Sequence, residues 1–170
     1  AWESVKQEKH EEVWGIPWSI YTFVLCYRRD LLERAQLDPE KAFATPEAMR
    51  ESFNTLNKNG ITPWAFPSLH PYADLAHIAS SWARAGGGDF ISADGRKPIF
   101  ANAAASAGLK NFFELIPFIP PALRGLSVEA CIQAFARGET AVLVGGLEVA
   151  DELLDSPYAT QEMRDNLGVT

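Results

Sequence analysis

The chain has 170 residues, of which 47% are hydrophobic and 22% charged, which is typical of one globular domain with a sizeable core. Its formal net charge of −7 argues against nucleic acid as a partner, because phosphate binding requires clustered Lys and Arg. No run approaches the roughly 20 apolar residues of a membrane-spanning helix, and the first residues lack the apolar centre of a signal peptide.

The first part of the chain predicts a buried strand followed directly by a helix. Residues 1–12 are highly charged and are expected to form a solvated lead-in or a helix end, so that the domain proper spans 13–170. Residues 20–27 are β-branched, aromatic and nearly continuously apolar, which is typical of a strand buried on both faces. A helical stretch follows at 28–35.

The next helix has a well-marked start. Thr45 offers a hydroxyl as N-cap, and Pro46 has the φ angle that a first helical residue needs. We expect this helix to run over 46–58 and to close at Asn59-Gly60. The short apolar stretch 61–66 contains a proline, which favours an edge strand.

Glycines and prolines divide the middle of the chain. A helix is expected at 72–85 and stops at the triple glycine 86–88, which follows a helix and therefore does not fit a phosphate-binding loop. The turn signature 92–95 predicts a small hairpin. Asn102 can cap a helix that runs to about residue 116, where prolines prevent its continuation.

The last third again alternates helix and strand. Ser127 caps a helix that Gly138 ends, and we expect Gly138 to adopt a left-handed conformation there. A strand at 140–144, a helix at 148–154 and the start of a further strand at 167–170 follow. Strands separated by helices predict an α/β domain with a central sheet flanked by helices.

Aromatic residues gather near predicted strand ends and proline-containing loops, where their side chains can face a cleft. Aromatic faces stack on the apolar face of a sugar ring while nearby polar groups bond its hydroxyls, although Trp and Tyr are also common core residues. The residues concerned are Trp14, Trp18, Tyr21, Trp64, Phe66 and Tyr72.

Few residues suggest catalysis. His70, Asp74 and His77 form the one compact group that resembles metal ligands or an acid–base pair, and a polar helix face is the simpler interpretation. No serine stands in a G-x-S-x-G context. Cys26 and Cys131 match no metal or redox spacing and are expected to be small buried apolar residues.

The order of several short motifs resembles family 1 extracellular solute-binding proteins, the maltose-binding-protein-like group of ABC importers. The motifs are Gly15-Ile16-Pro17-Trp18; Tyr27-Arg28-Arg29-Asp30-Leu31-Leu32-Glu33-Arg34-Ala35 with Leu37-Asp38-Pro39-Glu40; Gly87-Gly88-Asp89 with Phe100-Ala101-Asn102; Phe135-Ala136-Arg137-Gly138-Glu139-Thr140-Ala141-Val142; and Gly145-Gly146. They are similar to the family's "G-I-P-Y", "Y-Y-R-K-D-L-L-E-K-A-G-L-D-P", "G-G... F-N-S", "F-x-x-G-x-A-A-M" and "G-G-x-W". The resemblance covers about 13–170.

This resemblance implies one lobe of a type II periplasmic-binding-protein-like fold, in which a sugar lies between two lobes. The chain resembles the second lobe, and the first is missing. The residues that match the ligand wall are Trp18, Tyr21, the loop with His70 and Tyr72, and the turn after the glycine pair. At that turn Leu147-Glu148 replaces a stacking Trp, and Glu148 can accept bonds from hydroxyls or pair with a cation.

The function that the resemblance implies is recognition of a sugar or polyol, without catalysis and without a cofactor. The partners would be the missing first lobe and a membrane ABC permease, and the location periplasmic or extracellular, with a lipid anchor. Two other hypotheses remain. One is a small α/β hydrolase or metal-dependent enzyme that uses His70, Asp74 and His77, and the other is an interaction module whose exposed cleft face self-associates.

Overall fold

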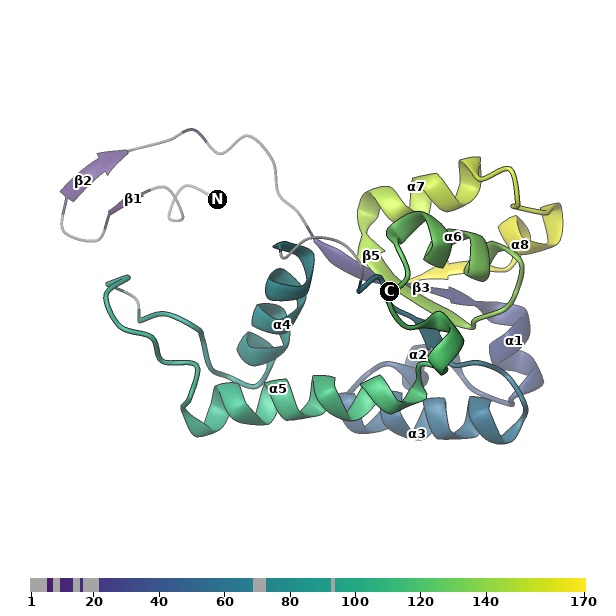
Figure 1. Ribbon diagram of the computed structural model, residues 1–170, viewed down its shortest axis with the longest axis horizontal. Coiled ribbons are helices and arrows are strands. Elements are labelled where there is room, and N and C mark those ends of the chain that lie inside the picture. The colour runs from purple at the N-terminus through teal and green to yellow at the C-terminus, as the bar shows by residue number, and fades with distance from the viewer. Residues whose placement is uncertain (1–5, 8–9, 14–15, 17–21, 69–72, 93) are drawn as a thin grey trace.

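The computed structural model describes residues 6–7, 10–13, 16, 22–68, 73–92 and 94–170 (Figure 1). Its main sheet has four strands in the order β4-β5-β3-β6, with β4 parallel to β5 and β3 antiparallel to both of its neighbours. The strands are β3 Phe23–Arg28, β4 Trp64–Ala65, β5 Val142–Gly146 and β6 Leu167–Val169. A separate antiparallel pair, β1 Lys6–Gln7 and β2 His10–Val13, lies in the charged N-terminal segment, where the sequence predicts a lead-in or a helix end.

Helices cover both faces of the main sheet (Figure 1). On one side lie α1 Arg29–Arg34, α2 Pro39–Ala42, α3 Pro46–Lys58, α4 Ala73–Ala85 and α5 Ala103–Leu115, followed by 3-10 turns at Ile116–Phe118 and Pro121–Leu123. On the other side lie α6 Val128–Ala136, α7 Leu147–Asp155 and α8 Gln161–Asp165. The predicted α/β class with a central sheet flanked by helices is confirmed.

Strand β5 is buried on both faces and divides the core in two. Val142 and Val144 belong to a cluster with Phe53 and Trp64, whereas the intervening Leu143 belongs to a second cluster with Phe135. Successive side chains of a strand point to opposite faces, so the apolar run 142–144 supplies both clusters at once. The two-sided burial explains why this strand lacks an alternating polar pattern.

Predicted caps form as expected. The hydroxyls of Thr45 and Ser127 and the side-chain oxygen of Asn102 accept from backbone amides three residues on, at the starts of α3, α6 and α5. Gly138 has a φ of +73°, which confirms its left-handed conformation at the end of α6. The hairpin after the triple glycine is reduced to a bridge between Ile91 and Pro98.

One strand boundary was predicted wrongly. The sequence suggests a strand at 140–144 with a turn after the glycine pair, but β5 continues through Gly145 and Gly146, which pair with Val24 and Phe23 of β3. Helix α7 begins at once with Leu147. Glycines are depleted in strands, and pairing with a neighbouring strand overrides this preference here.

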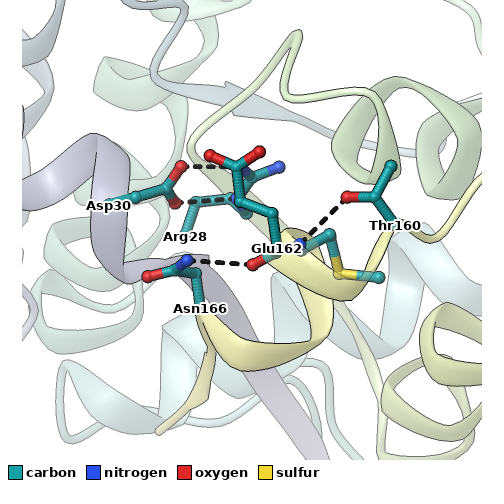
Figure 2. Close-up of polar contacts among 6 residues, drawn as sticks. Arg28, Asp30, Thr160, Glu162 and Asn166 are labelled. Atoms are coloured by element: carbon teal, nitrogen blue, oxygen red, sulfur yellow. Dashed lines mark hydrogen bonds and ion pairs between the residues drawn. The ribbon is translucent and has the colours of Figure 1, made fainter.

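The junction of β3 and α1 is held by a nearly buried ion pair (Figure 2). The Nε and Nη2 atoms of Arg28 donate to the two carboxylate oxygens of Asp30 at 2.8 and 2.6 Å, and the Arg28 side chain is 7% exposed. Beside it, the amide of Arg29 donates to the carbonyl of Asn166, and the Asn166 side chain donates to the carbonyl of Glu162 in α8. The pair therefore lies where β3, α1 and α8 meet.

The pKa of Asp30 follows from this environment. Burial raises it, but the hydrogen bonds and positive charge of Arg28 outweigh burial, so the pKa of Asp30 lies below its ordinary value. A carboxyl with a lowered pKa in the folded state stabilises the fold above its unfolded pKa, and that stabilisation disappears as pH falls through the folded pKa.

We predict that Asp30→Asn lowers the free energy of unfolding by about 2 kcal/mol at pH 7, because it leaves the Arg28 charge without its partner. The difference from the parent should begin to shrink below about pH 4, the ordinary pKa of an aspartic acid, and should vanish once the pH has fallen below the lower folded pKa of Asp30, where the parent carboxyl is itself protonated. Urea unfolding across pH measures this difference in the free energy of unfolding.

Asp38→Asn is the control. It breaks an exposed ion pair with Lys41 but keeps a capping side chain, so it should change the free energy of unfolding by less than about 0.5 kcal/mol at pH 7 and at low pH. A loss for Asp30→Asn that does not vary with pH would contradict the prediction.

Gln36 ends α1 in a conformation that suits glycine better. Its φ is +57°, the one positive value at a non-glycine position among the described residues, and the family signature has glycine at the corresponding place in A-G-L-D-P. The next amide, of Leu37, donates to the carbonyl of Leu32 at 2.9 Å and closes the helix end. This C-terminal hydrogen bond requires the left-handed conformation at Gln36.

We expect Gln36→Gly to raise the free energy of unfolding by about 0.5–1 kcal/mol, because glycine adopts this conformation without a Cβ clash. Thermal or urea denaturation measures the gain. Gln36→Ala keeps the Cβ and should give no gain; equal stability of the two variants would show that the Cβ causes no strain at this position.

Candidate functional site

A hollow of about 460 Å³ lies where β5 ends, β3 begins and β4 leaves the sheet. We name it the acidic hollow, after the three carboxylates that line it. Its lining residues are Phe23, Pro67, Ile78, Ser127, Val128, Glu129, Leu143, Val144, Gly145, Gly146, Glu148, Val149 and Glu152. In open α/β sheets, ligands bind at the carboxyl ends of parallel strands, and β4 and β5 both end here.

The glycine pair shapes this edge. A Cβ on Gly145 would come within 2.5 Å of Val149 Cγ2 and 2.8 Å of its Cβ. Helix α7 can therefore fold back onto the end of β5 because Gly145 has no side chain. This places Glu148 and Glu152, one turn apart on α7, at the rim of the hollow.

The hollow offers both donors and acceptors of hydrogen bonds. Gly146 is the N-cap of α7 and has no side chain to cap it, and the backbone amides of the first turn of a helix have no partner within the helix. The carboxylates of Glu129, Glu148 and Glu152 are acceptors, and the hydroxyl of Ser127 is both. The charged side chains of the described lining are Glu129, Glu148 and Glu152.

The structure describes one of the five predicted ligand-wall residues. Glu148 is exposed on the first turn of α7 and lines the acidic hollow. The other four, Trp18, Tyr21, His70 and Tyr72, lie outside the described residues.

Other aromatic candidates prove to be core residues. Trp64 and Phe66 are 1% and 2% exposed, and their rings pack together at 5.5 Å. The Trp64 indole donates to the carbonyl of Leu115 inside the core. The expectation that these two rings face a cleft, which was based on their position near a strand end, is therefore wrong. Trp14 lies outside the described residues.

The metal-site hypothesis finds no support in the described part of the chain. His77 is exposed on α4, and its carbonyl accepts from the hydroxyls of Ser80 and Ser81. His70 and the side chain of Asp74 lie outside the described residues. Among described residues, no group of three His, Cys, Asp or Glu could hold a metal ion.

Sequence reasoning missed most of the lining of the hollow. Phe23 reaches it because β3 runs antiparallel to β5, so that the start of one strand meets the end of the other. Glu129 reaches it from the first turn of α6. The capping serine before Glu129 was a usable signal, since it places an acidic residue in the first turn of a helix. No local pattern, however, indicates which strand lies beside β5.

A second hollow of about 320 Å³, the apolar cavity, lies between the main sheet and α3, α4 and α5. It is lined by Phe23, Val24, Leu25, Phe43, Ala44, Thr45, Pro46, Met49, Trp64, Phe66, Ile78, Ser81, Trp82, Ala85, Phe112, Val144 and Thr170. Phe23, Ile78 and Val144 line both hollows, which makes the two hollows neighbours across one wall.

The chain folds as an open α/β lobe, and the acidic hollow lies at the carboxyl ends of its two parallel strands. A family model described as bacterial extracellular solute-binding protein matches residues 1–161. The chain therefore belongs to this family of solute-binding proteins. A search of curated proteins found no match.

Solved structures agree in fold. A sugar transporter from Arthrobacter chlorophenolicus A6 with bound laminaribiose matches 99% of the chain at 19% identity and a TM-score of 0.76. Maltose-bound T. maritima MalE3 matches 99% at 20% identity and 0.74. A solute-binding protein from Agrobacterium vitis S4 with bound D-mannitol matches 88% at 17% identity and 0.71.

The chain spans less than half of each of these proteins. It covers 40% of the Arthrobacter chain, 42% of MalE3 and 36% of the Agrobacterium chain. Within the described residues, no helix is long and apolar enough to cross a membrane.

The two cysteine thiols lie in the core cluster next to the acidic hollow, where burial makes them unreactive. Cys26 and Cys131 are free, fully buried, and part of the same cluster as Leu143 and Val149 of the lining. Burial raises the pKa of Cys26 to about 11 and that of Cys131 to about 12. The expectation of small buried apolar residues is confirmed, and neither thiol is suited to act as a nucleophile.

We predict that both thiols of the folded chain react with a thiol reagent at pH 8 at least about a hundredfold more slowly than in urea, since burial limits access and suppresses the thiolate. A colorimetric disulfide reagent measures the rates. Reaction of either thiol in the folded protein at the unfolded rate would show that the second core cluster is open to solvent.

Proposed function

We propose that this chain is a solute-recognition lobe of an ABC importer and that it binds a sugar or related polyol in the acidic hollow. The observation that carries the proposal is the combination of the start of α7 and three carboxylates around one hollow at the sheet edge. The laminaribiose, maltose and D-mannitol bound in three solved structures of similar fold support the choice of ligand class.

The chemistry of the hydroxyl group explains why a sugar or polyol suits the acidic hollow. Each hydroxyl both donates and accepts, so it can bond a carboxylate and a backbone amide at the same time. Glu148 and Glu152 supply charged acceptors, and hydrogen bonds to charged groups are stronger than neutral ones. The amides at the start of α7 supply donors in fixed positions, which favours one orientation of the solute.

The proposal includes no catalysis and no cofactor. Membership of a solute-binding family supports this choice over a hydrolase or a metal-dependent enzyme. The buried thiols and the exposed, ungrouped His77 provide no competing reactive centre in the described part of the chain.

The partners that we propose are a first lobe, which closes the site from the opposite side, and a membrane permease. The larger size of the solved relatives supports a second lobe, since this chain covers 36–42% of three of them. The family description supports a location outside the cytoplasmic membrane, and we propose a lipid anchor in the parent protein.

Calorimetry with mannitol, ribitol, maltose and laminaribiose tests the proposal. We expect millimolar rather than micromolar dissociation constants, because one wall of a two-walled site leaves much of the solute hydrated. The sugar should be recovered unchanged, as judged by NMR. Absence of binding to every polyol at about 50 mM, or hydrolysis of a disaccharide, would overturn the proposal.

Glu148→Gln should weaken binding of the preferred polyol at least about fivefold, because it replaces a charged acceptor with a neutral one. Glu33→Gln is the matched control: Glu33 is exposed on α1, away from both hollows, and its replacement should leave binding unchanged. Unfolding curves of both variants separate an effect on binding from an effect on stability. Equal affinities of Glu148→Gln and the parent would remove Glu148 from the site.

A further inference from the structure

A third hollow, of about 440 Å³, lies between α6 and α7, which cover the same face of the sheet (Figure 1). We name it the α6–α7 groove. Ile132, Pro157 and Tyr158 give it an apolar lining, and Tyr158 is 40% exposed. The charged members of its lining are five exposed carboxylates, those of Glu129, Glu148, Asp151, Glu152 and Asp155. The groove therefore combines an apolar surface with a series of acids.

Four of the five carboxylates form a row along α7. Positions 148, 151, 152 and 155 follow the spacing i, i+3, i+4, i+7, which places their side chains on one face of a helix. From position 148 to position 155 a helix rises about 10 Å, and this is the length of the row. Glu129 joins the row from the first turn of α6.

This row is unfavourable for α7 itself. Like charges one turn apart destabilise a helix, and Asp155 places a carboxylate at the negative end of the helix dipole. The sequence of α7, LEVADELLD, contains no Lys or Arg that would offset the repulsion. Local features of a sequence normally agree with its fold, and the exceptions concentrate at functional sites. The repulsion within α7 therefore points to a positively charged partner that relieves it.

The arrangement of the acids indicates what kind of partner this is. Among described residues, no group of three His, Cys, Asp or Glu could hold a metal ion, so the row does not surround a single cation. Cationic side chains repeated along one face of a helix match carboxylates repeated along α7. A groove between two helices also admits the side chains of a third, and Ile132 and Tyr158 offer it apolar contact.

Two basic side chains of the chain approach the residues of the groove, and both already have partners. The Arg137 guanidinium lies 4.5 Å from the centroid of the Tyr158 ring and 3.8 Å from a carboxylate oxygen of Glu139. Arg164 donates to the carbonyl of Leu154. Neither arginine belongs to the lining of the groove. The contact with Arg137 shows that the Tyr158 ring accepts a guanidinium, which is the chemistry expected of the partner.

We propose that the α6–α7 groove docks a basic amphipathic helix of a partner protein. Lysine or arginine side chains of that helix face the row of acids on α7, and its apolar side chains contact Ile132 and Tyr158. Glu129, Glu148 and Glu152 also line the acidic hollow, whereas Asp151 and Asp155 line the groove and not the hollow. Docking can therefore be tested at Asp151 and Asp155 without a change in the proposed solute site.

The test compares two synthetic helical peptides of about 15 residues, a length at which alanine-rich helices form in water. Both contain the same alanine, leucine and lysine residues. The patterned peptide carries its lysines at the spacing i, i+3, i+4, i+7, and the scattered peptide distributes them around the helix. Calorimetry at low salt should show that the patterned peptide binds the chain at least about tenfold more tightly, because only its charges face the row together.

Two pairs of exposed acids provide matched double variants. Asp151 and Asp155 lie one turn apart on α7, and Glu47 and Glu51 lie one turn apart on α3, outside all three hollows. Asp151→Asn with Asp155→Asn should weaken binding of the patterned peptide at least about tenfold. Glu47→Gln with Glu51→Gln removes the same charge from the chain and should weaken binding less than about twofold.

Melting curves distinguish docking from a structural role of the acids. The α7 double variant should melt about 1–3 °C above the parent, because it relieves the repulsion along the helix. The α3 double variant should show no such gain, since Glu47 lies in the first turn of α3, where a carboxylate is favourable. A more stable fold with weaker binding is the result expected of acids that serve a partner.

Equal affinities for the two peptides, no binding of the patterned peptide, or equal losses in the two double variants would overturn the docking groove. Spermine that binds as tightly as the patterned peptide would also overturn it, because the row would then attract any flexible polycation. A lower melting temperature of the α7 double variant would show that these acids stabilise the fold, which contradicts the proposal. Titration with mannitol, ribitol, maltose and laminaribiose tests the proposed function separately, and the α7 double variant should leave those affinities unchanged.

Discussion

The packing of Val149 against the backbone of Gly145 is the contact on which the rest of the site depends. Because Gly145 lacks a Cβ, α7 can begin directly at the end of β5 and return along the sheet. This return places the start of α7 and the carboxylates of Glu148 and Glu152 around one hollow. A side chain at position 145 would separate helix and strand, and the donors and acceptors of the hollow would no longer face the same space.

The two-sided burial of β5 provides the rigidity that such a site needs. Val142 and Val144 pack into one cluster and Leu143 into the other, so the strand cannot shift register without exposing apolar side chains. The Arg28–Asp30 pair holds the far end of the neighbouring strand against α1, and backbone bonds from Arg29 to Asn166 join the same region to β6. The sheet edge with the hollow is thus the end of a tightly packed unit.

Two neighbouring hollows lie on this lobe and differ in their linings. Three carboxylates line one, and mainly aromatic and aliphatic side chains line the other. Three lining residues are common to both, Phe23, Ile78 and Val144, and they come from β3, α4 and β5.

The sequence by itself determined the class of fold, the caps of α3, α5 and α6 and the left-handed Gly138, because these depend on local patterns of hydrophobicity, capping and backbone preference. It also indicated the family, through short motifs in a fixed order. Tertiary structure decided that β5 continues through Gly145 and Gly146, that Trp64 and Phe66 are core rings, and that Phe23 and Glu129 meet Glu148 at one edge. These outcomes depend on which strands become neighbours, and the pairing of residues more than a hundred positions apart leaves no local pattern in the chain.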